Sequence, residues 1–173
     1  MPEGASLLGS WHDFYVVLGT ASGGLIGAMF VVVSIGSGFL TKDRANDVRI
    51  FVTPTMANLA TILLGCVLAL VPSLERISFS LLFGIGGLGG LAYASWIARH
   101  VTKREIEHID HFWYAIVPPI GYVAITAAAL LMAFGEPRNL ELLATGIAII
   151  LIAGLRNAWD MILFLIQQAK GPS

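Results

Sequence analysis

The chain has 173 residues, of which 57% are hydrophobic and only 12% are charged, and its mean hydropathy is +0.81. Soluble domains carry about 25% charged residues, so this composition indicates a membrane protein. The formal net charge of −1 excludes the dense basic surface that nucleic-acid binding requires. The sequence therefore predicts the lipid bilayer as a partner and predicts no nucleic acid.

Apolar stretches long enough to cross a bilayer as helices, which takes about 20 residues each, recur five times along the chain. They are predicted at about 14–40, 50–71, 77–98, 112–134 and 140–166. Their continuous apolarity lacks the alternation of a barrel strand. We expect an all-α polytopic membrane protein, in which residues 1–173 form a single domain, a bundle of five transmembrane helices.

The basic residues predict the orientation. Seven of the ten Lys and Arg residues lie in the first connector, the third connector and the C-terminal tail: Lys42, Arg44, Arg49, Arg99, Lys103, Arg104 and Lys170. The opposite side carries only Arg76 and Arg138. Because basic connectors stay in the cytoplasm, we expect the N-terminus outside, the C-terminus in the cytoplasm, and location in a bacterial inner (plasma) membrane.

Small residues repeat at helical spacing in the first and third spans. Gly19, Gly23 and Gly27 are four residues apart, and Gly86 and Gly90 repeat this spacing. Glycine faces let helix backbones approach closely in lipid, which favours helix packing and a homo-oligomer. The alternative is that the exposed backbone contacts a substrate.

The second span contains Asn58 near its middle and Pro54 nearer its start. An amide without a partner is costly in hydrocarbon, so Asn58 is predicted to hydrogen-bond either another helix or a solute. Pro54 is predicted to lie in about the first helical turn, where proline is tolerated.

Two prolines interrupt the fourth span. Pro118 and Pro119 lack backbone donors, so the carbonyls of Tyr114 and Ala115 lose their helical partners and the helix should kink. Tyr122 falls on the same face as Pro118, one turn further along. This break predicts either a static kink or a site for an ion or a bent solute.

The fifth span carries a polar stripe at membrane depth. It consists of Glu141, Thr145, Arg156, Asp160 and Gln167, which share a sector of the helix. Each charge near the bilayer centre costs about 2.5 to 3.5 kcal/mol, so Arg156 and Asp160, one turn apart, are predicted to pair or to face a wet cavity, turned away from lipid. Asn157 lies about 100° around the helix from Arg156 and is predicted to contact a different neighbour.

These residues support two hypotheses. In the first, the fifth helix lines a pathway for ions, protons or a small solute, with contributions from Asn58 and Tyr122. In the second, the chain is a membrane scaffold or regulatory subunit of another protein, in which Arg156 and Asp160 form a structural pair.

The third connector is rich in histidine. Glu107, His108 and His111 have the separations at which helical side chains can share a divalent cation. The ligand set is incomplete, so pH sensing by histidine and a solvated connector remain alternatives.

Catalytic motifs are not found. The sequence has no phosphate loop, dinucleotide fingerprint, nucleophile elbow or HExxH pair. His12 and Asp13 form an acid-base pair without a nucleophile pattern, which leaves an enzyme acting on lipid as a third reading. We therefore expect neither enzymatic activity nor a cofactor.

Overall fold

The computed structural model describes residues 3–36, 42–101, 112–135 and 139–169. Its elements are helices α1 (Glu3–Gly36), α2 (Lys42–Ala69) and α3 (Arg76–Val101), a π-helical turn η2 (Phe112–Ile116), and helices α5 (Val117–Ala133) and α6 (Asn139–Ala169). Within these ranges, five helical segments are long and apolar enough to cross a membrane. The prediction of an all-α chain with five such helices is confirmed.

Two helices extend well beyond the predicted spans at their N-terminal ends. α1 begins at Glu3 and α2 begins at Lys42, because a helix can continue through polar residues after its apolar part has ended. The prediction for Pro54 was therefore wrong: it lies inside α2 rather than near its first turn. There it cannot donate to the carbonyl four residues earlier.

The proline pair in the fourth span is accommodated by a change of helix type. Residues Phe112–Ile116 form the π-helical turn η2, and Pro118 and Pro119 lie at the start of α5. Proline is tolerated in the first turn of a helix, where backbone N–H groups have no helical acceptor. The predicted interruption thus takes the form of a wider turn followed by a new α-helix.

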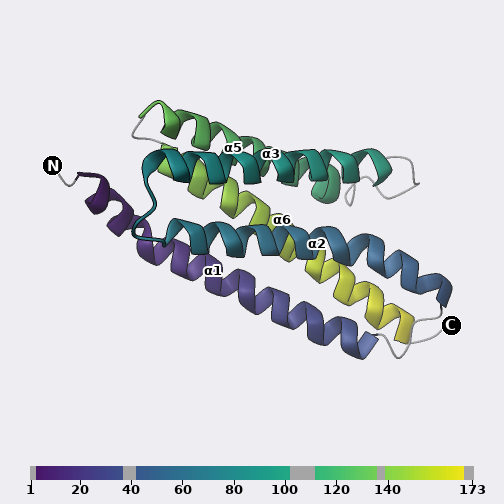
Figure 1. Cartoon of the computed structure of the whole chain (residues 1–173). Helices are drawn as coiled ribbons and strands as arrows, with labels where there is room; N and C mark the ends of the chain where they lie inside the picture. Colours follow the sequence, from purple (N-terminus) through teal and green to yellow (C-terminus); the bar gives the residue numbers. More distant parts are fainter. Residues whose placement is uncertain (1–2, 37–41, 102–111, 136–138, 170–173) are drawn as a thin grey trace.

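The helices form two pairs with α6 between them (Figure 1). α3 packs along α5, α1 packs along α2, and α6 crosses between the pairs, with its main contacts to α5 and α2. The core lies around α6 and includes Leu59, Tyr122, Ile147 and Ile150. α6 therefore has more of its apolar span buried than any other described helix.

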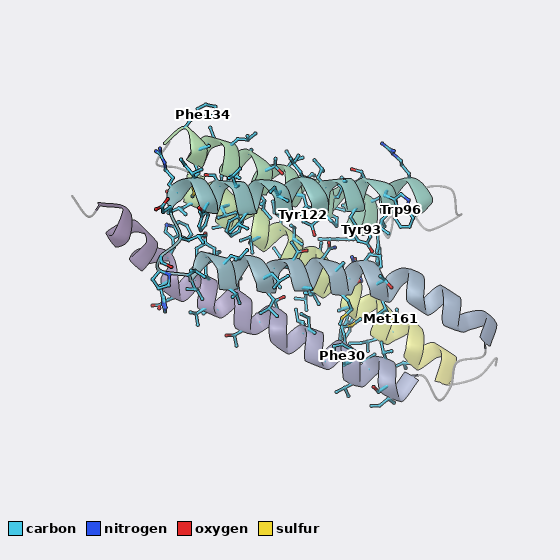
Figure 2. All side chains as sticks on the ribbon, viewed as in Figure 1. Phe30, Tyr93, Trp96, Tyr122, Phe134 and Met161 are labelled. Carbon is cyan, nitrogen blue, oxygen red and sulfur yellow. The ribbon has the colours of Figure 1, made fainter. Side chains whose placement is uncertain are left out.

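Large apolar side chains cover much of the outer surface. Phe30 of α1 and Phe134, after α5, point away from the bundle, whereas Tyr122 lies between the two helix pairs (Figure 2). Val17, Ile85 and other large apolar residues are also exposed. Patches of this kind are rare on soluble monomers and are suited to contact with acyl chains.

Candidate polar site on α6

The centre of the candidate site is an ion pair within α6. Arg156 Nη1 pairs with Asp160 Oδ1, one helical turn further along. Their side chains are 34% and 21% exposed, so the pair lies at the edge of the bundle rather than in its centre. Pairing leaves the two residues with no net charge between them, which would lower the cost of placing them in a membrane.

The second oxygen of the carboxylate is not satisfied by this pair. Asp160 Oδ2 is buried and receives no hydrogen bond from any residue that the structure describes. An ionised carboxylate can accept several hydrogen bonds, and a buried acceptor without a donor is costly. This oxygen is therefore a candidate to bind a proton.

Asn157 adds a second unsatisfied acceptor next to the carboxylate. Its side chain is 1% exposed, and its Oδ1 has no donor within the described part of the chain. At 100° per residue, Asp160 lies 40° and Asn157 lies 100° around α6 from Arg156. The carboxylate thus falls between the guanidinium and the amide, and two acceptors share one side of the helix.

The π-helical turn contacts α6 at this level. The Tyr114 hydroxyl of η2 donates to the backbone carbonyl of Asn157 over 3.3 Å. Pro118 and Pro119 cannot donate to the carbonyls of Tyr114 and Ala115, and the helix changes type at this point. The sequence predicted the helix break and the polar stripe separately, and the fold brings them into contact.

The part of the predicted stripe near the start of α6 is more exposed than Arg156 and Asp160. Glu141 and Thr145 are exposed, and the Thr145 hydroxyl donates to the Glu141 carbonyl over 2.8 Å. Gln167 belongs to α6, but its side chain lies outside the described residues. The stripe is therefore directed outward near the start of α6 and partly inward around Asn157 and Asp160.

Asn58 and Tyr122 form a buried bond with each other. The Tyr122 hydroxyl donates to Asn58 Oδ1 over 2.9 Å, which links α5 to α2. Both side chains are buried. The predicted hydrogen bond of Asn58 is thus made to another helix, and this contact needs no solute to explain it.

The predicted packing glycines divide into two groups. A Cβ at Gly19 would lie 3.1 Å from Cys66 Cβ, one at Gly23 would touch Leu63 at 4.0 Å, and one at Gly90 would overlap the Tyr122 ring. In contrast, a Cβ at Gly27 or Gly86 would meet nothing within 4 Å. The first group serves packing within one chain, and the second leaves open space.

Gly121 and Gly146, which no predicted packing motif includes, lie where the backbones of α5 and α6 are close. A Cβ at Gly121 would lie 2.9 Å from the Gly146 carbonyl oxygen, and one at Gly146 would lie 2.8 Å from the Gly121 carbonyl oxygen. Neither residue belongs to a run of glycines at four-residue spacing. The repeat pattern that pointed to α1 and α3 therefore could not reveal them.

Of the other candidate sites, the structure describes one. His12 Nδ1 and Asp13 Oδ1 are 3.1 Å apart, and both side chains are exposed. Glu107, His108 and His111 lie outside the described residues. The described part of the chain contains no group of three or more His, Cys, Asp or Glu residues placed to hold a metal ion.

The geometry on α6 is thus an ion pair whose second carboxylate oxygen, like the neighbouring Asn157 oxygen, is buried and has no donor among the described residues. Such a group can bind a proton or a small cation, or hold water that carries one. Comparison of the chain with protein-family models, with curated proteins and with solved structures gives no match.

Proposed function

We propose that the chain is an integral protein of a bacterial inner membrane, with its N-terminus outside and its C-terminus in the cytoplasm. Two observations support this proposal. Apolar side chains cover the outer surface of the bundle. The end of α1, the start of α2 and the ends of α3 and α6 lie at one end of the bundle (Figure 1), and seven basic residues lie in these helix ends or follow them in the sequence: Lys42, Arg44, Arg49, Arg99, Lys103, Arg104 and Lys170.

Labelling of single cysteines tests this orientation. In a Cys66→Ala background, a cysteine at Ser73, in the turn between α2 and α3, should react with a membrane-impermeant maleimide in intact cells. A cysteine at Ser173 should react only after the membrane is permeabilised. The reverse pattern would contradict the orientation, and labelling of both positions in intact cells would contradict the proposal of five membrane crossings.

We further propose that α6 carries protons across the membrane, with Asp160 as the proton acceptor. The observation that supports this most strongly is the pair of buried acceptors, Asn157 Oδ1 and Asp160 Oδ2, which have no donor among the described residues. Two acceptors attract a proton donor, such as water or hydronium, and repel an anion. An ionisable residue at membrane depth is by default a functional candidate.

The ion pair gives this site a simple cycle. When hydronium transfers a proton to the Asp160 carboxylate and leaves as water, the side chain becomes neutral and Arg156 loses its counter-charge. The guanidinium can then turn toward the membrane surface, as long basic side chains do. When the proton leaves to the other side, the carboxylate is ionised again and the pair with Arg156 re-forms.

A second copy of the chain would complete the pathway. Glu141 and Thr145 are directed away from the bundle in the single chain, so the polar stripe is only partly covered. Closed symmetric oligomers are the common way in which small chains enclose a shared path. We therefore propose that copies associate with this side of α6 facing inward.

Proton flux into proteoliposomes tests the function. With a pH-sensitive dye inside and a potassium diffusion potential set by valinomycin, the wild-type protein should acidify the lumen faster than protein-free vesicles do. Asp160→Asn should reduce the rate to that of protein-free vesicles, because an amide cannot bind and release a proton at this position. Arg156→Leu should also reduce it.

Ser80→Ala is the matched control. Ser80 also has a buried oxygen without a hydrogen-bond partner in the described structure, but it belongs to α3, so its replacement should leave the flux unchanged. Equal rates for wild type and protein-free vesicles would contradict proton conduction. If flux of K⁺ or Na⁺ were lost in Asp160→Asn while proton flux was absent, the carried ion would be a metal cation instead.

The scaffold hypothesis has one observation in its favour. Arg156 and Asp160 neutralise each other within the single chain, as a purely structural pair would. However, both residues belong to α6, and an ion pair within one helix does not fix the position of that helix against another. For this reason we place the scaffold second, and an absence of flux for every ion tested would favour it.

A further inference from the structure

A cavity of about 230 Å³ lies between α2, α3, α5 and α6, apart from the polar site on α6. Most of its wall is apolar, and no charged residue lines it. For comparison, a dry apolar cavity of about 150 Å³ is large enough to bind benzene. The cavity is therefore large enough for part of an organic ligand.

The polar groups at the cavity are already engaged within the protein. Thr61 and Tyr122 line it. The Thr61 hydroxyl donates to the Ala57 carbonyl over 2.9 Å, and the Tyr122 hydroxyl donates to Asn58 over 2.9 Å. Since both donors are in use, the cavity offers no free hydroxyl proton to a headgroup or an anion, and its chemistry suits hydrocarbon.

The cavity opens sideways between α2 and α3. Leu64 of α2 and Leu82 of α3 line it and are also exposed, at 63% and 41%. Gly86 lines it as well, and a Cβ there would meet nothing within 4 Å. The missing side chain at Gly86 thus contributes to the opening, which faces the same surface that we assign to the bilayer.

The length and volume of the cavity indicate which kind of ligand can enter it. From Thr61 to Leu68 the cavity follows α2 for seven residues, which is about 10 Å at 1.5 Å per residue. A helix with its side chains is about 10 to 12 Å wide and could not enter a space of 230 Å³. A single hydrocarbon chain, lying parallel to the helices as lipid tails do, fits both the length and the apolar wall.

We propose that this cavity binds one hydrocarbon chain of a membrane lipid, which enters sideways between α2 and α3. The chain lies in the half of the bilayer next to the turn that joins these helices, with its end near Thr61 and Tyr122. The attraction comes from close packing, because lipid tails provide no hydrophobic drive of their own. This site depends on insertion in a membrane and does not depend on proton conduction.

Photocrosslinking with a phosphatidylglycerol that carries a diazirine at the end of one acyl chain tests the proposal. In proteoliposomes, peptide mapping should find adducts concentrated on the cavity residues Thr61 and Tyr122, where the chain is expected to end. Gly86→Leu fills the opening and should reduce these adducts several-fold. Gly89→Leu is the matched control, because Gly89 is on the same helix, also meets nothing within 4 Å and does not line the cavity.

Leu64→Trp, which places bulk at the other edge of the opening, serves as the second blocking variant if Gly86→Leu does not fold. Adducts spread equally over the outward residues Ile85 and Leu88, and unchanged by both blocking variants, would overturn the proposal. The absence of adducts at Thr61 and Tyr122 in the wild-type protein would also overturn it. Loss of adducts in a blocking variant with normal proton flux would support the lipid site and leave the proposed function unaffected.

Discussion

Asp160→Leu is expected to destabilise the protein far more than the double replacement Arg156→Leu/Asp160→Leu. The single change leaves the guanidinium of Arg156 without its counter-charge, and breaking a buried pair from one side costs about 3 to 5 kcal/mol. Because Arg156 is 34% exposed, we expect a loss near the lower limit, about 3 kcal/mol. Replacing both charges by apolar residues should cost about 1 kcal/mol or less, since such replacements are often neutral or stabilising.

Unfolding by SDS in mixed micelles measures these free energies, and the four proteins of the double-mutant cycle yield the interaction between the two residues. Trp159→Leu is a suitable control, since Trp159 precedes Asp160 but is exposed on another side of α6. A double variant that is as unstable as the single variant would contradict the argument. A stable double variant without proton flux would separate the functional role of the pair from its structural role.

Gly146→Ala is expected to lower the free energy of unfolding by about 1 to 3 kcal/mol, the usual effect of overpacking. A Cβ at this position would lie 2.8 Å from the Gly121 carbonyl oxygen and 3.0 Å from the Ile125 backbone nitrogen. Backbone atoms cannot turn aside as a side chain can, so α5 and α6 must move apart. The higher helix propensity of alanine, about 1 kcal/mol, offsets only part of this loss.

Gly24→Ala makes the same chemical change in open space, because a Cβ at Gly24 would meet nothing within 4 Å. It should leave the stability unchanged or raise it by up to about 1 kcal/mol. The same SDS titration compares the two variants. If Gly146→Ala were as stable as Gly24→Ala, the close approach of α5 and α6 would be wrong.

The need for some contacts could be derived from the sequence, but their partners could not. Asn58 in an apolar span had to find a hydrogen-bond partner, yet only the packing of α2 against α5 identifies Tyr122 as that partner. In the same way, Pro118 and Pro119 required an interruption in the helix. Only the structure shows that it takes the form of a π-helical turn that contacts Asn157.

The spacing of the small residues predicted helix packing correctly at some positions and not at others. Gly19 and Gly90 lie against neighbouring helices, but Gly27 and Gly86 do not, although all follow the same spacing. Spacing places residues on one face of a helix but does not determine how far along that face a neighbour stays close. Gly121 and Gly146, at which α5 and α6 lie close together, belong to no repeat that would mark them.

The sequence by itself determined the all-helical class, the number of apolar segments and the polar residues of the last one. These follow from composition and from the fixed geometry of a helix, which need no knowledge of neighbours. Only the tertiary structure decided that Asn157 is buried, that Thr145 is exposed and that a cavity lies between α2 and α3. In helices that are apolar on every side, the hydrophobic pattern cannot select the buried face, so shape and small residues decide which surfaces meet.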